Sequence, residues 1–200
     1  DHLSVHRYAR NWSRDTARYV AFGSTLGAQL DRLRTVLGDV AHEEGWERAP
    51  TLSVDEWNVW YRTYPGMIGR SVLPPRVNGK APRLLEEIYT LEDALVVAGF
   101  LNAFLRNADI VRIANLAQAV NVIAPVLTRG DDLLVQSIFD AFRLYSSRRH
   151  GDSLRIDQVG PTYDLWRTAT VPFLDVTAVA GPGVLHVFAV NRSLDAAAPL

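Results

Sequence analysis

The feature that most constrains the fold is an alternation of β-rich and helical segments over the first 150 residues. The order strand, helix, strand, helix, strand, helix predicts an α/β fold, because a helix that joins two parallel strands covers a face of their sheet. A complete (β/α)8 barrel takes about 250 residues. The segment is therefore either a smaller open sheet or the last units of a barrel. In chain order we expect a strand over 1–8, a helix over 13–44, a strand over 51–57, a helix after 90, a strand over 109–115 and a helix over 133–147.

The helical segments also carry start signals. Ser13 is a possible N-cap of the first helix. Thr90 and Asp93 match the ends of a capping box, and the helix that follows is apolar on nearly all sides. This composition predicts a helix buried between a sheet and neighbouring helices.

The pattern changes after residue 151, where short alternating stretches replace the long helical ones. Residues 185–190 alternate in polarity, and the Gly181-Pro182-Gly183 run before them predicts a hairpin turn. We therefore expect residues 1–150 to form the α/β part and residues 151–200 to begin an all-β domain.

The composition excludes several classes of function. The formal charge of -1 provides no electrostatic footprint for nucleic acid or an anionic membrane. Cysteine is absent, so the chain has neither a disulfide framework nor a thiol nucleophile. The longest apolar run, over 94–105, is shorter than the roughly 20 residues that span a bilayer. The first residues resemble the middle of a strand, and we expect the chain to be a fragment.

The most informative residue is Glu56, at the end of the second predicted strand. Leu52, Val54 and Glu56 would share one face of a regular strand, so a carboxylate ends an otherwise apolar face. A long loop with aromatic residues is predicted over 57–83. Catalytic groups in parallel barrels sit at the carboxyl ends of strands. Retaining glycosidases use two carboxyl groups about 5 Å apart, and Glu56 has the position expected of one of them.

Four blocks of sequence resemble family 51 α-L-arabinofuranosidases, and they occur in the family's order. The run at 54–61, Val-Asp-Glu-Trp-Asn-Val-Trp-Tyr, resembles the family's nucleophile motif. The run at 113–125 resembles the loop that follows its eighth strand. The other two blocks are Ser-Val-His-Arg-Tyr at 4–8 and Glu-Asp-Ala-Leu at 92–95.

The resemblance implies a fold and a set of site residues. The three strands would be strands six to eight of a (β/α)8 TIM barrel, and the residues after 150 would begin a C-terminal β-sandwich. Glu56 would be the nucleophile, Tyr8 its hydrogen-bonding partner and Gln118 a contact to the arabinose. Trp60 would form an aromatic wall near the substrate. His6 shares a strand face with Tyr8, and its role is open.

The same residues also have structural interpretations. Glu56 could be a strand-end carboxylate in a salt bridge, Tyr8 a half-buried aromatic residue, and Gln118 an amide that caps backbone groups. Trp57 and Asn58 are expected to shape the loop.

The family's acid/base glutamate follows an asparagine at the end of strand four, and we find no counterpart here. Glu43, Glu44 and Glu47 lie at a polar helix end, in the wrong context. The resemblance implies an exo-acting, retaining α-L-arabinofuranosidase that removes terminal arabinofuranosyl residues from hemicelluloses such as arabinan, and that needs no metal or organic cofactor. The 200 residues alone are expected to be inactive. Alternatives are an endoglucanase or β-xylosidase on the same barrel, or a non-catalytic carbohydrate-binding remnant.

The expected partner is an arabinose-containing oligo- or polysaccharide, with no nucleic acid and no membrane. The resemblance also implies a homo-oligomer at full length. The absence of cysteine fits a reducing compartment, and we expect a cytoplasmic location.

Overall fold

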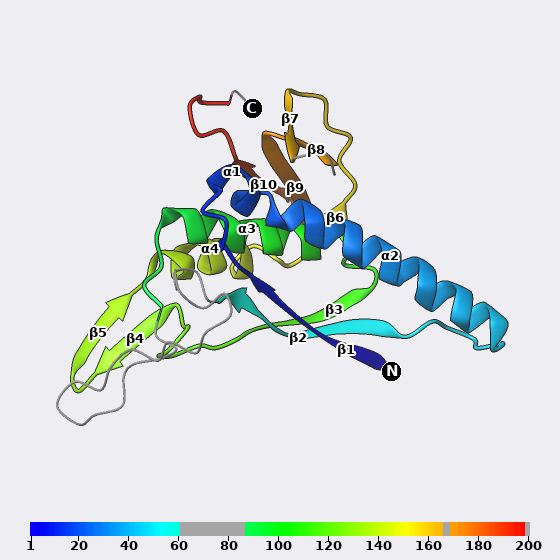
Figure 1. Ribbon diagram of the computed structural model, residues 1–200. Coiled ribbons are helices and arrows are strands. Elements are labelled where there is room, and N and C mark those ends of the chain that lie inside the picture. The colour runs from blue at the N-terminus through cyan, green and yellow to red at the C-terminus, as the bar shows by residue number, and fades with distance from the viewer. Residues whose placement is uncertain (61–86, 166–168, 199–200) are drawn as a thin grey trace.

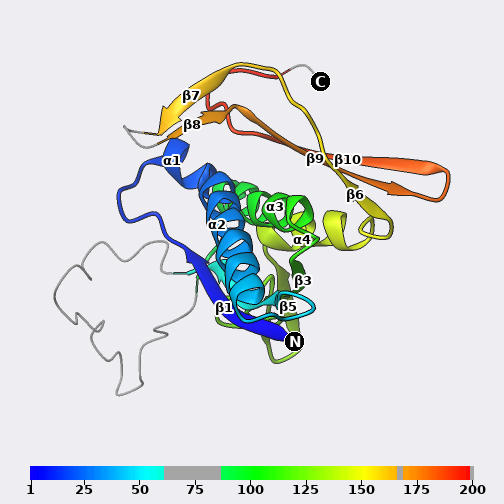
Figure 2. The ribbon, with the colours of Figure 1, turned by 90° about the vertical axis from the view of Figure 1, so that its right-hand side faces the viewer.

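The computed structural model describes residues 1–60, 87–165 and 169–198 and arranges them in three layers (Figures 1 and 2). A parallel sheet forms the first layer, helices the second, and antiparallel strands the third. The helices are α1 (Thr16–Val20), α2 (Phe22–Glu43), α3 (Leu91–Arg106) and α4 (Ser137–Ser146). The strands are β1 (His2–Ala9), β2 (Thr51–Val59), β3 (Val111–Leu116), β4 (Val126–Arg129), β5 (Asp132–Val135), β6 (Asp152–Leu154), β7 (Thr162–Leu165), β8 (Ala169–Pro172), β9 (Leu174–Gly181) and β10 (Val184–Asn191).

The predicted parallel sheet is confirmed. Its order is β1-β2-β3, and both pairs of neighbours run parallel. α2 connects β1 to β2 and α3 connects β2 to β3, so both crossover helices lie on the same face of the sheet (Figure 1). The other face is not covered by a helix of the described chain.

The first helical segment differs from its prediction in two ways. It begins at Thr16 rather than near Ser13, because the carboxylate of Asp15 accepts the backbone N–H of Arg18 at 3.0 Å and caps the helix. It is also interrupted at Ala21, whose φ of -84° and ψ of 1° separate α1 from α2. Ser13 is therefore not the N-cap.

α3 is the central helix, and its predicted start and burial are confirmed, although strands as well as neighbouring helices cover it. The Thr90–Asp93 capping box is present, and the backbone N–H of Thr90 donates to Asp93 at 2.6 Å. The helix lies between the sheet below and the C-terminal strands above (Figure 2). It crosses α2 closely: a Cβ placed on Gly23 would lie 2.4 Å from the carbonyl oxygen of Gly99. Only glycine at position 23 permits this approach.

The third predicted helix begins later than expected. Residues 126–135 form a β4–β5 hairpin, and α4 starts at Ser137, not at 133. Gly130 occupies the turn with φ of 61°, a conformation that favours glycine. The apolar residues Leu133, Leu134 and Val135 are exposed on this hairpin instead of lining a helix face.

The C-terminal strands confirm the predicted hairpin. β9 and β10 pair antiparallel, with Gly181 opposite Val184 across the turn. β6 pairs with β9, and β7 with β8. The layers share one apolar core, because Val179 and Phe188 belong to the same buried cluster as Trp57 of β2. Of the helices in the described ranges, none is long and apolar enough to cross a bilayer.

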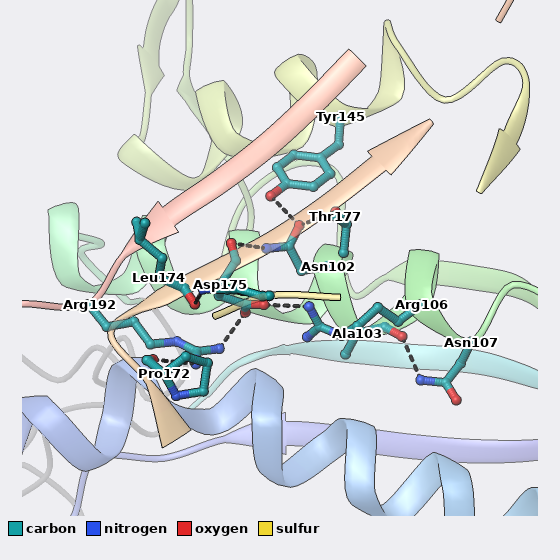
Figure 3. A network of polar contacts seen from close by, with 11 residues as sticks. Asn102, Ala103, Arg106, Asn107, Tyr145, Pro172, Leu174, Asp175, Thr177 and Arg192 are labelled. Atoms are coloured by element: carbon teal, nitrogen blue, oxygen red, sulfur yellow. Dashed lines mark hydrogen bonds and ion pairs between the residues drawn. The ribbon is translucent and has the colours of Figure 1, made fainter. Parts of the chain in front are cut away.

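A polar network joins α3 to the C-terminal strands (Figure 3). The side chain of Asn102 donates to the carbonyl of Asp175 at 2.9 Å and accepts the hydroxyls of Tyr145 and Thr177, each at 2.7 Å. The carboxylate of Asp175 pairs with Arg192, and both side chains are buried. We call these residues, together with Arg106, which also pairs with Asp175, the interlayer network.

Candidate active site

One extra residue in β2 determines which way its acidic side chains face. Between Ser4 and His6, β1 advances by two residues while β2 advances from Ser53 to Glu56, which is three. β2 also has one extra residue relative to β3. From the pair Val54–Ala114 to the pair Trp57–Leu116, β2 advances by three residues and β3 by two. This is a β-bulge, in which two residues of one strand oppose a single residue of its neighbour.

The bulge overturns one prediction from the sequence. Leu52 and Val54 are fully buried, but the next buried residue is Trp57 and not Glu56. The ring of Trp57 packs against Phe100 and Phe104 of α3, at centroid distances of 5.1 and 5.2 Å. Glu56 therefore leaves the apolar face and lies on the open face of the sheet.

Glu56 meets Tyr8 on that open face, as predicted. The Tyr8 hydroxyl donates a hydrogen bond to Glu56 Oε2 at 3.0 Å. Burial, and secondly this hydrogen bond, raises the pKa of Tyr8 to about 12. Tyr8 consequently keeps its proton at any neutral pH and remains a donor to the carboxylate.

His6 lies between two carboxylates. Its Nδ1 is 3.4 Å from Glu56 Oε2, and its Nε2 is 3.5 Å from Asp55 Oδ1. The hydroxyl of Ser4 is 2.8 Å from Asp55 Oδ1 and 2.9 Å from Oδ2. We refer to Ser4, His6, Tyr8, Asp55 and Glu56 as the open-face cluster.

Trp60 completes one side of this cluster. Its ring lies 5.3 Å from that of Tyr8, with an interplanar angle of 57°. Because Tyr8 touches both Trp60 and Glu56, the structure brings three of the four predicted site residues together. The rest of the predicted aromatic loop, from Tyr61 to residue 83, lies outside the described residues.

Gln118 lies at the same edge of the sheet but does not join the cluster. It is exposed, and its side chain makes no hydrogen bond to another described residue. Its loop is anchored by Asn58, whose amide nitrogen donates to the carbonyls of Ala117, at 2.7 Å, and Ile123. Trp57 and Asn58 were expected to shape the aromatic loop over 57–83, but both lie in β2, where Trp57 is buried in the core and Asn58 holds the loop after β3 instead. The peptide bond between Ala117 and Gln118 is cis.

The sequence interpretation missed Asp55 and left His6 without a role. The signal available was the adjacent acidic pair at 55–56, since two neighbouring acidic residues can share a face only at a bulge. Within the described ranges, no three His, Cys, Asp or Glu side chains are grouped to hold a metal ion.

A carboxylate oriented by a tyrosine at a parallel-sheet edge, with a tryptophan beside it, is the arrangement expected of a glycoside hydrolase. Comparison with known proteins gives the family within that class. Residues 55–196 match the sequence model of the α-L-arabinofuranosidase C-terminal domain, and the chain belongs to this family.

The chain is also similar to individual members. It is 36% identical, over 96% of its length, to an intracellular exo-α-(1→5)-L-arabinofuranosidase of Halalkalibacterium halodurans, of which it covers 38%. It is 36% identical, over its whole length, to the enzyme of the same name from Streptomyces lividans, of which it covers 30%. The chain therefore spans only about a third of these relatives.

A solved structure agrees with these matches. The family 51 α-L-arabinofuranosidase from Bifidobacterium longum superposes with a TM-score of 0.81 at 25% identity. The match covers 98% of this chain and 39% of that one.

Proposed function

We propose that this chain is part of a retaining, exo-acting α-L-arabinofuranosidase in which Glu56 is the nucleophile. The single observation that carries the proposal is the hydrogen bond from Tyr8 to Glu56 Oε2 on the open face of the sheet. Support also comes from relatives named as exo-α-(1→5)- and exo-α-(1→6)-L-arabinofuranosidases. The substrates would be arabinose-containing hemicelluloses with terminal, non-reducing arabinofuranosyl residues.

The reaction would proceed in two steps. A carboxylate oxygen of Glu56 bonds to the anomeric carbon, while the bond from that carbon to the leaving oxygen breaks and an acid transfers its proton to this oxygen. Water then attacks the anomeric carbon, the acid/base group takes the water proton, and the bond to Glu56 breaks. Both contacts described for the carboxylate involve Oε2, so we assign Oε1 to the attack.

The neighbouring residues would have supporting roles. Tyr8 and His6 would hold the carboxylate in one orientation, which is a positioning role. Trp60 would form a wall beside the sugar, and Gln118 would bind sugar hydroxyls from the loop after β3. Support for Gln118 is its place at the same sheet edge, where Asn58 fixes the loop.

We also propose how the chain fits a larger enzyme. β1, β2 and β3 would correspond to strands six, seven and eight of a (β/α)8 barrel, formed by residues 1–150, and residues 151–200 would begin a C-terminal β-sandwich. The uncovered polar face of the sheet supports this, since it would then face the barrel interior. The acid/base carboxyl group would come from outside these 200 residues, so the isolated chain would be inactive.

The setting of the enzyme follows its relatives. Four of them are named intracellular, which supports a cytoplasmic location. A homo-oligomer of the full-length protein is part of the same proposal, and size-exclusion chromatography with light scattering would test it.

The test is covalent labelling of the longest natural polypeptide that carries this chain. A cyclophellitol-type arabinofuranose inhibitor should add one inhibitor mass, mapped by peptide mass spectrometry to Glu56. The adduct should be absent in Glu56→Gln and retained in Glu47→Gln, a matched control at an exposed glutamate beyond α2.

Two results would contradict the proposal. Labelling at another carboxylate would exclude Glu56 as the nucleophile. Absence of labelling in the folded protein, together with cleavage of an aryl glucoside or xyloside, would favour an endoglucanase or β-xylosidase.

A further inference from the structure

The loop that carries Gln118 contains two residues in an unfavourable backbone conformation. Asn121 has a φ of 62° and Val122 a φ of 64°, which is the left-handed region. Asparagine tolerates this region, but a β-branched residue such as valine rarely adopts it. A conformation of this kind persists only where surrounding contacts impose it, and such residues are frequent at functional sites. The contacts that hold the loop therefore indicate what its shape serves.

The first anchor of the loop lies just before Gln118 and is buried. The amide nitrogen of Asn58, a fully buried residue of β2, donates to the carbonyl of Ala117 at 2.7 Å. The backbone N–H of Ala117 also donates to the carbonyl of Trp57 at 3.1 Å. The residue before Gln118 is thus fixed to the central strand of the parallel sheet.

The second anchor lies three residues after Gln118 and involves the β4–β5 hairpin, at the lower left of Figure 1. Asn121 Oδ1 accepts the backbone N–H of Thr128 at 2.7 Å, and Asn121 Nδ2 donates to the hydroxyl of Thr128 at 3.1 Å. The backbone N–H of Asn121 also donates to the carbonyl of Val126 at 2.8 Å. The side chain of Asn121 therefore holds the loop against the hairpin.

We propose that Asn121 is a positioning residue for sugar binding, because it fixes the segment that presents Gln118 to the substrate. The inference rests on the proposed function, in which Gln118 binds sugar hydroxyls. Between the two anchors only residues 118–120 are left, and all three are exposed. A segment this short has little freedom once both of its ends are held, so less entropy is lost when Gln118 binds a sugar. Releasing the second anchor should weaken sugar binding and leave the buried core intact.

The test is a double-mutant cycle in the longest natural polypeptide that carries this chain, with an aryl α-L-arabinofuranoside as the substrate. Asn121→Gly removes the side chain but keeps a residue that adopts a positive φ. It should lower kcat/KM roughly tenfold, chiefly by raising KM, because a contact made equally in the ground and transition states appears in KM. Gln118→Ala should cause a similar loss. The double variant should be no worse than Gln118→Ala alone, because Asn121 acts through Gln118.

Three further variants serve as controls, and melting temperatures show whether each variant is folded. Asn121→Asp keeps the acceptor for the backbone N–H of Thr128 and tolerates the left-handed conformation, so it should retain kcat/KM. Asn191→Gly removes a matched side chain at the end of β10, whose Oδ1 accepts the backbone N–H of Ser193 at 2.9 Å, and should leave kcat/KM unchanged. If Asn121→Gly does not fold, Thr128→Val, which removes only the hydroxyl, replaces it in the cycle with a smaller expected loss.

The outcomes separate this inference from the proposed function. Additive losses in the double variant, no loss for the single variant of the second anchor, or an equal loss for Asn191→Gly would overturn the role of Asn121 while the enzyme remains an arabinofuranosidase. A wild-type protein that does not cleave the arabinofuranoside would contradict the proposed function, and this inference with it.

Discussion

The open-face cluster and the interlayer network use similar residues in opposite environments. Each contains an acidic side chain bound by neighbouring groups. Glu56 is 48% exposed and is contacted by a phenol and an imidazole. Asp175 is 3% exposed and is paired with two guanidinium groups. The difference in burial explains the difference in partners. The charge of Asp175 is removed from water, so ion pairs must compensate for nearly all of its lost hydration.

The contrast shows why one carboxylate suits chemistry and the other suits structure. Both charges of the buried pair are committed to each other, and burial lowers the pKa of Arg192 while Asp175 opposes that shift. Glu56 faces open space and is held in position by Tyr8, so its charge is available to a ligand. Substitutions in the two regions should therefore affect different properties.

The largest effect is expected for Glu56→Gln. If Glu56 is the nucleophile, as proposed, its removal should lower kcat of the full-length protein by roughly 10⁴-fold or more. The free energy of unfolding should change by less than about 0.5 kcal/mol, because the side chain is exposed. Steady-state kinetics and urea unfolding measure the two effects. A large loss of stability would mean that Glu56 has a structural role and would break the comparison.

Asp175→Asn should have the reverse effect. It leaves the buried guanidinium of Arg192 without its counterion, which should reduce the free energy of unfolding by about 3–5 kcal/mol. The urea midpoint should fall accordingly, while kcat of the remaining folded protein is preserved. Asp140→Asn removes an exposed ion pair with Arg143 and should cost less than about 1 kcal/mol.

Tyr8→Phe removes one hydroxyl from the open-face cluster. We expect kcat to fall roughly 10- to 100-fold, because a hydrogen bond to a charged group contributes about 1.5–3 kcal/mol. The melting temperature should change little. A KM effect with unchanged kcat would show that Tyr8 contacts the substrate and does not orient Glu56.

Tyr145→Phe is the same substitution in the interlayer network. The lost hydroxyl donates to Asn102, which still accepts the hydroxyl of Thr177. Stability should therefore fall by only about 1 kcal/mol, with kcat unaffected. Differential scanning calorimetry should show a lower melting temperature for Tyr145→Phe and little change for Tyr8→Phe. Equal losses in the two variants would contradict the comparison.

A further effect concerns pH. The pKa of Tyr8 is raised to about 12, so the folded state holds this proton more tightly than the unfolded chain, where tyrosine has a pKa of about 10. The resulting stability is complete below pH 10 and is lost as the pH rises through about 12. Unfolding free energy between these values should decrease more steeply in the wild type than in Tyr8→Phe. Parallel pH profiles would argue against a raised pKa of Tyr8, which burial and then the hydrogen bond to Glu56 cause.

The sequence predicted the elements whose signals are local. The capping box at Thr90 and the Gly181–Gly183 turn depend on neighbouring residues, and both were found where expected. The pairing of Tyr8 with Glu56 followed from the family resemblance, and the geometry agrees with it.

Features that depend on tertiary contacts were missed. The helix predicted from Leu133 ignored the turn at Gly130, and the hydrophobic pattern of Leu133 to Val135 does not distinguish a short strand from the first turn of a helix. The orientation of Glu56 was wrong because alternation was counted without a bulge. The register of β2 against β1 shows that bulge, and the register against β3 shows it again.

The bulge has a consequence for how proteins of this fold can vary in length. If Asp55 were deleted, regular alternation would still place Val54 inward, Glu56 outward and Trp57 inward, so the buried side chains would keep their places. One residue can thus be gained or lost inside a central strand without exchanging its two faces. Alignments of homologous enzymes should accordingly permit a one-residue gap here, and engineers could insert a different side chain beside Glu56 at this position.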